Sequence, residues 1–267
     1  MSDRKARPEG DARELGLSRQ EIDDECNEIS DKLSSSARRE VIERHALAAY
    51  GDRPHLRGTK QEHARAVAKA ATRLAAQVFG SDESLTLGER RMNCLHAEMA
   101  GLLHEALLFT GLTGDVEMLA VTDDPLLNRL ICRLTPAVAD PEPIRLDRLR
   151  NRVGFSQVAQ VVKLADLCHD MGLALRLIRE PRTGCFERLR LLSREVEVFL
   201  KLEATSTPQG FRDLWRCSEV REIVGSLRRS NKKLTGYLDD LDAREKKREV
   251  RRVLAEALDT DEELTNY

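Results

Sequence analysis

The chain has 267 residues and a formal charge of −2, and 41% of its residues are apolar while 34% are charged. The apolar fraction is enough for a hydrophobic core, and the length allows one large domain or one domain with extensions. The near-neutral charge gives no global field that would favour nucleic acid or an anionic membrane. Aromatic residues are scarce, and the dominance of Ala, Leu, Arg and Glu favours helix throughout.

The six cysteines form no CxxC pair, so their spacing does not indicate a zinc knuckle. No secretory leader is recognisable at the start, and the longest apolar runs are far shorter than a membrane span. We therefore expect a cytoplasmic protein in a reducing compartment, with no membrane partner.

The expected elements are all helices, separated by loops rich in Gly, Pro and Ser. Residues 1–35 read as a polar, partly mobile segment that contains a short helix at 19–33. The helices predicted after it cover 37–50, 59–79, 90–110, parts of 115–134, 155–178, 186–203, a stretch around Trp215, and 234–258. We predict an all-α protein with a helical domain at 36–180 and a C-terminal helical extension at 181–267.

One stretch combines ionisable and apolar residues in an unusual way. Ala100 to Thr110 reads as an apolar helical run, yet its middle holds His104 and Glu105 side by side. A buried ionisable pair costs free energy unless something pairs with it. His63 and Asp166 also lie in apolar helical segments. Imidazole and carboxylate ligands together suit Mn, Fe or a similar divalent ion, so these residues are candidate metal ligands.

Three motifs follow one another along the chain: Arg57-Gly-Thr-Lys-Gln-Glu-His63, Ala100-Gly-Leu-Leu-His-Glu105 and Lys163-Leu-Ala-Asp-Leu-Cys-His-Asp-Met171. Together they resemble the H…HD…D pattern of the HD-domain metal-dependent phosphohydrolases. The similarity is closest to the alarmone hydrolase domain of RelA/SpoT homologues and to the small stand-alone alarmone hydrolases. The resemblance covers roughly residues 37–180 and implies an HD-domain-like helical bundle.

The resemblance also implies a site and a reaction. It implies hydrolysis of a nucleotide related to (p)ppGpp, supported by a divalent metal, most simply Mn. The metal ligands would be His63, His104, Glu105 and Asp166, with Glu105 and Asp166 also catalytic, and Arg57, Lys60 and Asp170 would contact substrate.

The chain departs from the family pattern at several positions. Glu105 stands where the family has a shorter aspartate, and Asp170 stands where it has an asparagine. Leu108 and Phe109 replace a Glu-Asp pair that takes part in catalysis. A second hypothesis is therefore a catalytically degenerate protein of the same fold that binds a nucleotide or a protein partner without turnover.

A third hypothesis needs no metal at all, because each candidate has a plain structural reading. His63 could be a partly exposed residue near a helix start, and Glu105 could pair with an arginine. Asp166 could form a salt bridge with Arg129 or Arg133, while Lys163 would be solvated. The chain would then be a helical interaction protein, with a partner bound through its C-terminal helices.

The basic stretch Arg244 to Arg252 is interleaved with acids and lacks aromatic residues for base stacking. We interpret it as a solvated helix face, and we do not expect nucleic acid as a partner.

Overall fold

The computed structural model describes residues 17–110, 115–135, 142–154, 156–179, 185–202, 214–215 and 217–264. These residues form helices joined by turns and loops, and the only β-type pairing among them is an isolated bridge between Pro54 and Thr59. The predicted all-α fold class is confirmed. None of the described helices combines the length and the apolar content that crossing a bilayer requires.

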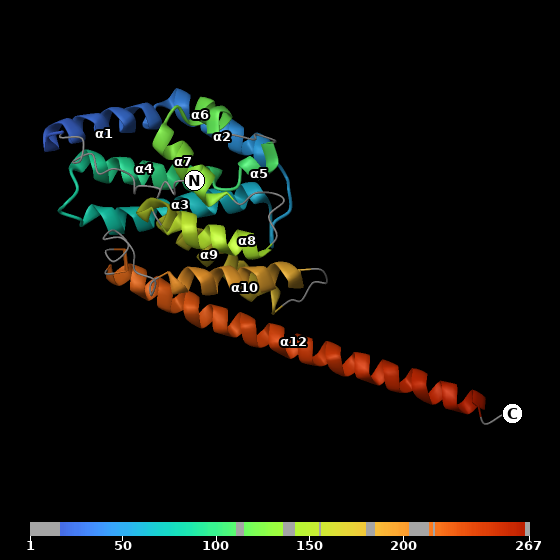
Figure 1. Ribbon diagram of the computed structural model, residues 1–267. Coiled ribbons are helices and arrows are strands. Elements are labelled where there is room, and N and C mark those ends of the chain that lie inside the picture. The colour runs from blue at the N-terminus through green and yellow to red at the C-terminus, as the bar shows by residue number, and fades with distance from the viewer. Residues whose placement is uncertain are drawn as a thin grey trace, which may run out of the picture.

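The helices in chain order are α1 (Arg19–Ser34), α2 (Ser36–Tyr50), α3 (Lys60–Gly80), α4 (Leu87–Leu103), α5 (Leu107–Thr110), α6 (Asp115–Thr122), α7 (Pro125–Leu134), α8 (Glu142–Arg148), α9 (Gln157–Leu177), α10 (Phe186–Lys201) and α12 (Ser218–Leu264). A short π-helical segment, Leu149–Val153, follows α8 directly. Figure 1 shows them stacked in a bundle, from which α12 extends toward the C-terminus.

Capping boxes fix where several of these helices begin. Ser18, Thr59 and Thr86 each accept a hydrogen bond from the backbone of a glutamate three residues on, and that glutamate accepts one from the capping residue's own N–H. Each box satisfies backbone donors that a helix N-terminus leaves without partners. Because Thr86 caps α4, this helix begins at Leu87, three residues before the predicted start.

Helix α3 lies at the centre of the bundle, between α4 and α9. Val67, Ala71 and Ala75 on its buried face are fully enclosed. The approach of α4 is close because Gly101 faces the α3 backbone, where a Cβ on Gly101 would lie 2.8 Å from the Cα of Ala68. This close approach brings the end of α4 next to the start of α3.

The prediction of one continuous helix over 90–110 was wrong, because the helix is interrupted at residues 104–106. The interruption matters for the site, since it contains His104 and Glu105. Helix α4 ends at Leu103, and a turn separates it from α5. Side chains satisfy the backbone groups at the break. The Thr135 hydroxyl donates to the His104 carbonyl at 2.8 Å, and the Glu105 amide donates to the Tyr50 hydroxyl at 3.2 Å. His104 and Glu105 therefore lie at a helix end rather than inside a helix.

The last helix begins much earlier than the sequence pattern predicts. It spans Ser218–Leu264 rather than 234–258, and Gly225 and Gly236 do not break it. A glycine inside a helix costs only about 1 kcal/mol relative to alanine. The buried residues Val220, Val224 and Leu227, spaced three and four apart, pack the first part of α12 into the bundle, so packing outweighs the local preference.

The described helices share one cluster of buried hydrophobic residues, which runs from Leu33 in α1 to Leu238 in α12. Helix α1 is capped and packs against α4, and α10 and α12 pack against α9. Of the segment 1–35 that was predicted to be partly mobile, residues 1–16 lie outside the described residues. The division at residues 35 and 181 stays a prediction.

Candidate metal centre

Three of the predicted metal ligands converge from three helices. His63 lies at the start of α3, His104 directly follows α4, and Asp166 lies in α9. His63 Nε2 is 3.2 Å from His104 Nε2 and 3.2 Å from Asp166 Oδ1, and His104 Nε2 is 3.6 Å from the same oxygen. All three residues are buried, and their ligand atoms lie within 4.8 Å of one another, a spacing that could hold a metal ion.

A backbone hydrogen bond determines which nitrogen of the His104 ring carries a proton. His104 Nδ1 lies 2.8 Å from the carbonyl oxygen of Gly101, and because a carbonyl only accepts, Nδ1 carries the proton. While the ring is neutral, the Nε2 lone pair faces Asp166 Oδ1, which is also an acceptor. Burial opposes protonation of Nε2, but the charge of Asp166 and the hydrogen bond that a protonated Nε2 can donate to it raise the pKa of His104. The three residues thus attract positive charge, which a divalent cation would supply.

Lys163 holds the other oxygen of Asp166. Its Nζ donates to Asp166 Oδ2 at 2.8 Å and to Glu195 Oε2 at 3.0 Å, and its side chain is only 13% exposed. Burial alone would raise the pKa of Asp166, but the Lys163 charge and the neighbouring histidines hold that pKa well below its usual value. The predicted solvated Lys163 is therefore wrong, and the partner of Asp166 is Lys163 rather than Arg129 or Arg133.

Glu105 is not part of this three-residue group, so its role as a metal ligand stays a prediction. Its carboxylate accepts a hydrogen bond from Lys60, whose side chain is 7% exposed. Burial raises the pKa of Glu105, but the charges of His104 and Lys60 outweigh it and lower the pKa to about 2. Glu105 is thus ionised, and the positive charge of Lys60 is already compensated before any phosphate arrives.

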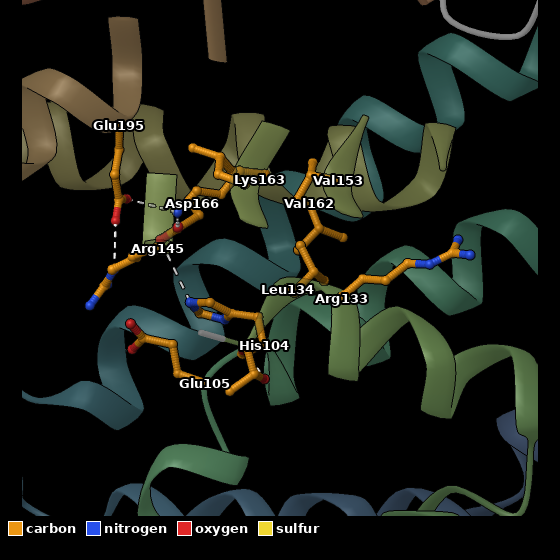
Figure 2. Close-up of a pocket in the computed structure, with 12 residues that line it drawn as sticks. His104, Glu105, Arg133, Leu134, Arg145, Val153, Val162, Lys163, Asp166 and Glu195 are labelled. Carbon is orange, nitrogen blue, oxygen red and sulfur yellow. Dashed lines mark hydrogen bonds and ion pairs between the residues drawn. The ribbon is translucent and has the colours of Figure 1, made fainter. Parts of the chain in front are cut away.

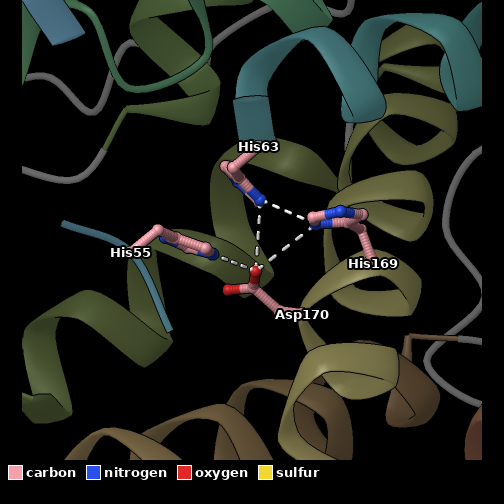
Figure 3. A group of neighbouring side chains, drawn as sticks. All are labelled: His55, His63, His169 and Asp170. Atoms are coloured by element: carbon pink, nitrogen blue, oxygen red, sulfur yellow. Dashed lines mark hydrogen bonds and ion pairs between the residues drawn. The ribbon is translucent and has the colours of Figure 1, made fainter. Parts of the chain in front are cut away.

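A second group meets on the other side of His63 (Figure 3). Asp170 Oδ1 lies 2.5 Å from His55 Nε2 and 3.2 Å from His63 Nδ1, and His169 Nδ1 lies 2.9 Å from His63 Nδ1. Arg188 in α10 contacts His55 Nδ1 at 2.8 Å. Burial lowers the pKa of His55 to about 4, so this ring is neutral near pH 7. The predicted substrate contact Asp170 is thus surrounded by histidines.

His55 and His169 were not among the predicted site residues, although one signal was present. His169 directly precedes Asp170, and it is the second histidine of the chain followed by an acid, after His104. His55 lies in the loop before α3, and nothing in its local sequence marks it. Its position depends on the turn in which the His55 amide donates to the Gly58 carbonyl at 3.0 Å. Gly58 has φ +97°, a conformation that favours glycine.

A cleft of about 490 Å³ opens beside both groups. It is lined by Lys60, Glu105, Leu108, Phe109, Glu142, Arg145, Lys163, Asp166, Asp170, Glu187, Arg188, Leu191, Leu192 and Glu195. A smaller cavity of about 40 Å³ shares the Asp166–Lys163–Glu195 wall and also contacts His104 (Figure 2). Arg145 donates to Glu195 at 3.0 Å across this wall. Each cation that lines the cleft therefore contacts a carboxylate or a histidine.

The predictions for Arg57 and for Leu108 and Phe109 can be compared with the lining of this cleft. Arg57, predicted to contact phosphate, is exposed in the loop before α3 and does not line the cleft. Leu108 and Phe109 do line it. The Phe109 ring packs edge-on to Tyr50 with centroids 6.0 Å apart, and the Arg53 guanidinium lies 5.0 Å above it.

No protein-family model matches the sequence, and no curated protein or solved structure matches it either. A function for this chain is therefore inferred from the geometry of the site and from the sequence resemblance.

Proposed function

We propose that this chain is a metal-dependent phosphohydrolase that acts on a nucleotide, with guanosine alarmones as the substrate class that the sequence resemblance implies. One observation carries the proposal. His63, His104 and Asp166 meet in a buried group, and the Gly101 carbonyl fixes His104 with a lone pair facing that group. Two imidazoles and a carboxylate suit Mn or Fe and leave coordination positions for water and substrate.

In this proposal a divalent ion and the side chains of the protein contribute differently to phosphate hydrolysis. A bound divalent cation supplies a water activated at neutral pH and polarises a phosphoryl oxygen. Asp166 would hold the ion through Oδ1, while Lys163 donates a hydrogen bond to Oδ2 and prevents the carboxylate from turning away. With a pKa near 2, Glu105 holds a proton poorly, but it can orient a water by accepting a hydrogen bond if its pair with Lys60 opens.

The cleft supplies the space for a substrate. Its volume of about 490 Å³ is within the roughly 300–1,000 Å³ that small-molecule sites occupy. Lys60 and Arg145 would bind phosphate by exchanging their present partners for phosphate oxygens. Since carboxylates outnumber cations along the wall, we expect an anionic substrate to bind well only after the metal ion has added its charge.

A specific observation favours the alternative of binding without turnover. Leu108 and Phe109 present apolar surface to the cleft where the related hydrolases use an acidic pair. Neither side chain can accept a proton or orient water. In this alternative the metal would hold a nucleotide or another phosphorylated ligand in place.

The deciding experiment combines elemental analysis with a Mn-supplemented phosphohydrolase screen that includes guanosine tetraphosphate. We expect about one bound ion per chain and turnover that is lost in His104→Ala. His96→Ala is the matched control, because His96 is also buried but faces a different carboxylate. Metal binding without turnover would favour the alternative. Absence of metal, with His104→Ala unchanged, would contradict both and leave the helical interaction protein.

A further inference from the structure

We propose that Arg188, His55 and Asp170 form a hydrogen-bonded chain that fixes the ring of His63 in the tautomer and orientation that metal binding needs. None of these three belongs to the group of His63, His104 and Asp166, although His55 and Asp170 belong with His63 and His169 to a second group that could hold a metal ion. An ion there would need the lone pair of His63 Nδ1, so a proton on Nδ1 makes the three positioning residues rather than ligands. The inference rests on the proposed metal site but does not require turnover. It also assigns Asp170 a different role from the substrate contact that the resemblance implies.

The donors and acceptors along this hydrogen-bonded series follow from Arg188, its outermost residue. A guanidinium has only donors, so Arg188 donates to His55 Nδ1, 2.8 Å away, and that nitrogen must offer its lone pair. In a neutral imidazole the remaining proton is then on Nε2. His55 Nε2 lies 2.5 Å from Asp170 Oδ1, which can only accept while the carboxyl is ionised. Arg188 therefore determines which nitrogen of His55 faces Asp170.

The same reasoning extends to His63. Asp170 Oδ1 lies 3.2 Å from His63 Nδ1 and favours a proton on that nitrogen. His63 Nε2 is then left with its lone pair, and this atom is the one that lies 3.2 Å from both His104 Nε2 and Asp166 Oδ1. His169 Nδ1, 2.9 Å from His63 Nδ1, can share the same proton as a second acceptor.

Ring packing restricts the orientation as well as the tautomer. The rings of His55 and His63 stack with centroids 4.0 Å apart and an interplanar angle of 26°. The side chain of His55 is fully buried and that of Asp170 is 14% exposed. The loop before α3, together with α9 and α10, thus holds one face and one edge of the His63 ring.

The two histidines of the proposed metal site are therefore held in matching ways. The Gly101 carbonyl binds Nδ1 of His104, and the Asp170 carboxylate faces Nδ1 of His63. Both rings direct Nε2 toward Asp166. A carboxylate or carbonyl behind a ligating imidazole commonly fixes its tautomer and increases its basicity, and its removal costs roughly 10–100-fold in metal affinity.

The first test measures the Mn affinity of the wild-type chain and of Asp170→Asn by calorimetry. We expect binding to weaken about 10–100-fold in the variant. Asp124→Asn is the matched control, because the Asp124 carboxylate also contacts a histidine, 2.6 Å from His96, and neither residue belongs to a group that could hold a metal. The control should bind Mn as the wild type does.

A second pair of variants tests Arg188, the outermost residue of the hydrogen-bonded series, without replacing a buried side chain. Arg188 is 40% exposed, so its replacement should be tolerated by the fold. We expect Arg188→Ala to weaken Mn binding by less than Asp170→Asn, and Arg188→Lys, which keeps a donor-only group, to recover part of that loss. A purely structural role of Arg188 would not distinguish these two replacements.

Nitrogen-15 NMR of the histidine rings in protein stripped of divalent ions gives a readout that is independent of binding. We expect a protonated Nε2 in His55 and a protonated Nδ1 in His63. The opposite tautomer of His63, or equal Mn affinity in Asp170→Asn and wild type, would overturn the inference while leaving the hydrolase proposal intact. Mn binding without turnover would overturn only the hydrolase. A wild-type chain that binds no Mn would overturn both.

Discussion

Two buried histidine–carboxylate arrangements in this molecule use the same residue types for different ends. His96 Nε2 lies 2.6 Å from Asp124 Oδ2, and the other oxygen of Asp124 accepts from the backbone amides of Leu126 and Leu127 at the start of α7. Both oxygens have donors, so this pair is complete. At Asp166, one oxygen accepts from Lys163, but the other faces two imidazole nitrogens, and His104 Nε2 offers it no donor while that ring is neutral.

The difference shows that burial of a histidine beside an acid does not by itself indicate a metal site. What distinguishes the Asp166 group is an excess of acceptors over donors. Such an excess is costly in a buried site unless a cation compensates it. The following variants would break or sharpen this contrast, beginning with the largest expected effect.

Replacing His104 by alanine should remove the metal site. The loss of Mn affinity should exceed the roughly 10–100-fold that follows from loss of a residue behind a ligand, because one of three converging ligand atoms disappears. His96→Ala should leave Mn affinity unchanged although it disrupts an equally buried pair. Calorimetric titration measures the Mn affinity of both variants. An equal loss of affinity in the two would show that Mn does not bind specifically at the Asp166 group.

Replacing Lys163 by methionine should destabilise the fold strongly. It leaves Asp166 and Glu195 buried without their shared cation, and breaking such a buried network costs about 3–5 kcal/mol. Urea unfolding with and without Mn measures the effect, and we expect Mn to restore more stability in the variant than in the wild type. Lys32→Met, which removes only an exposed pair with Glu28, should hardly move the unfolding midpoint.

Adding a methyl group at Gly101 should weaken both the fold and the site. A Cβ there would meet the backbone of Ala68 at 2.8 Å, so α3 and α4 must separate, at a cost of about 1–3 kcal/mol for overpacking. The separation would move His104 away from His63, so Mn affinity should fall as well. In Gly172→Ala, where no atom lies within 4 Å of the new Cβ, we expect up to about 1 kcal/mol of stabilisation and unchanged Mn affinity. An unchanged Gly101→Ala would show that this contact does not position the site.

The sequence predicts the helices well and the site only in part, for physical reasons. Caps and breakers are local signals, so the starts of α1, α2 and α3 are predicted to within one residue. The interruption at His104 depends on Thr135 and Tyr50, and the continuity of α12 depends on packing. Both are distant in sequence from the segment they affect, so no local pattern reveals them.

The same distinction applies to the site residues. His63, His104 and Asp166 lie in motifs that the sequence shows directly, and they do meet. Glu105 was assigned by its place in a motif, but its side chain pairs with Lys60 from another helix. His55 reaches the site through the loop before α3 and is held by Arg188 from α10. Such contacts depend on how helices pack, which a single sequence does not determine.

The smallest predicted effect concerns how the His96–Asp124 pair changes the pH dependence of folding stability. Burial disfavours the Asp124 carboxylate, but the His96 hydrogen bond and the two backbone amides lower its pKa below the usual value. A carboxyl whose pKa is lower in the folded than in the unfolded chain contributes stability above the unfolded value, near pH 4, and that stability is lost as the pH falls through the folded value. Asparagine caps a helix about as well as aspartate, so Asp124→Asn should lose mainly the contact of the charged carboxylate with His96. We expect a cost of about 0.5–1.5 kcal/mol at pH 7, the usual net contribution of one hydrogen bond, and less in acid.

Urea midpoints of wild type and Asp124→Asn between pH 3 and pH 7 would show this convergence. At pH 7 Mn should stabilise both proteins equally, because Asp124 does not belong to the metal group. A gap between the two proteins that stays constant down to pH 3 would mean that the Asp124 charge contributes nothing. A smaller stabilisation of the variant by Mn would link the two histidine–carboxylate pairs, which the geometry keeps apart.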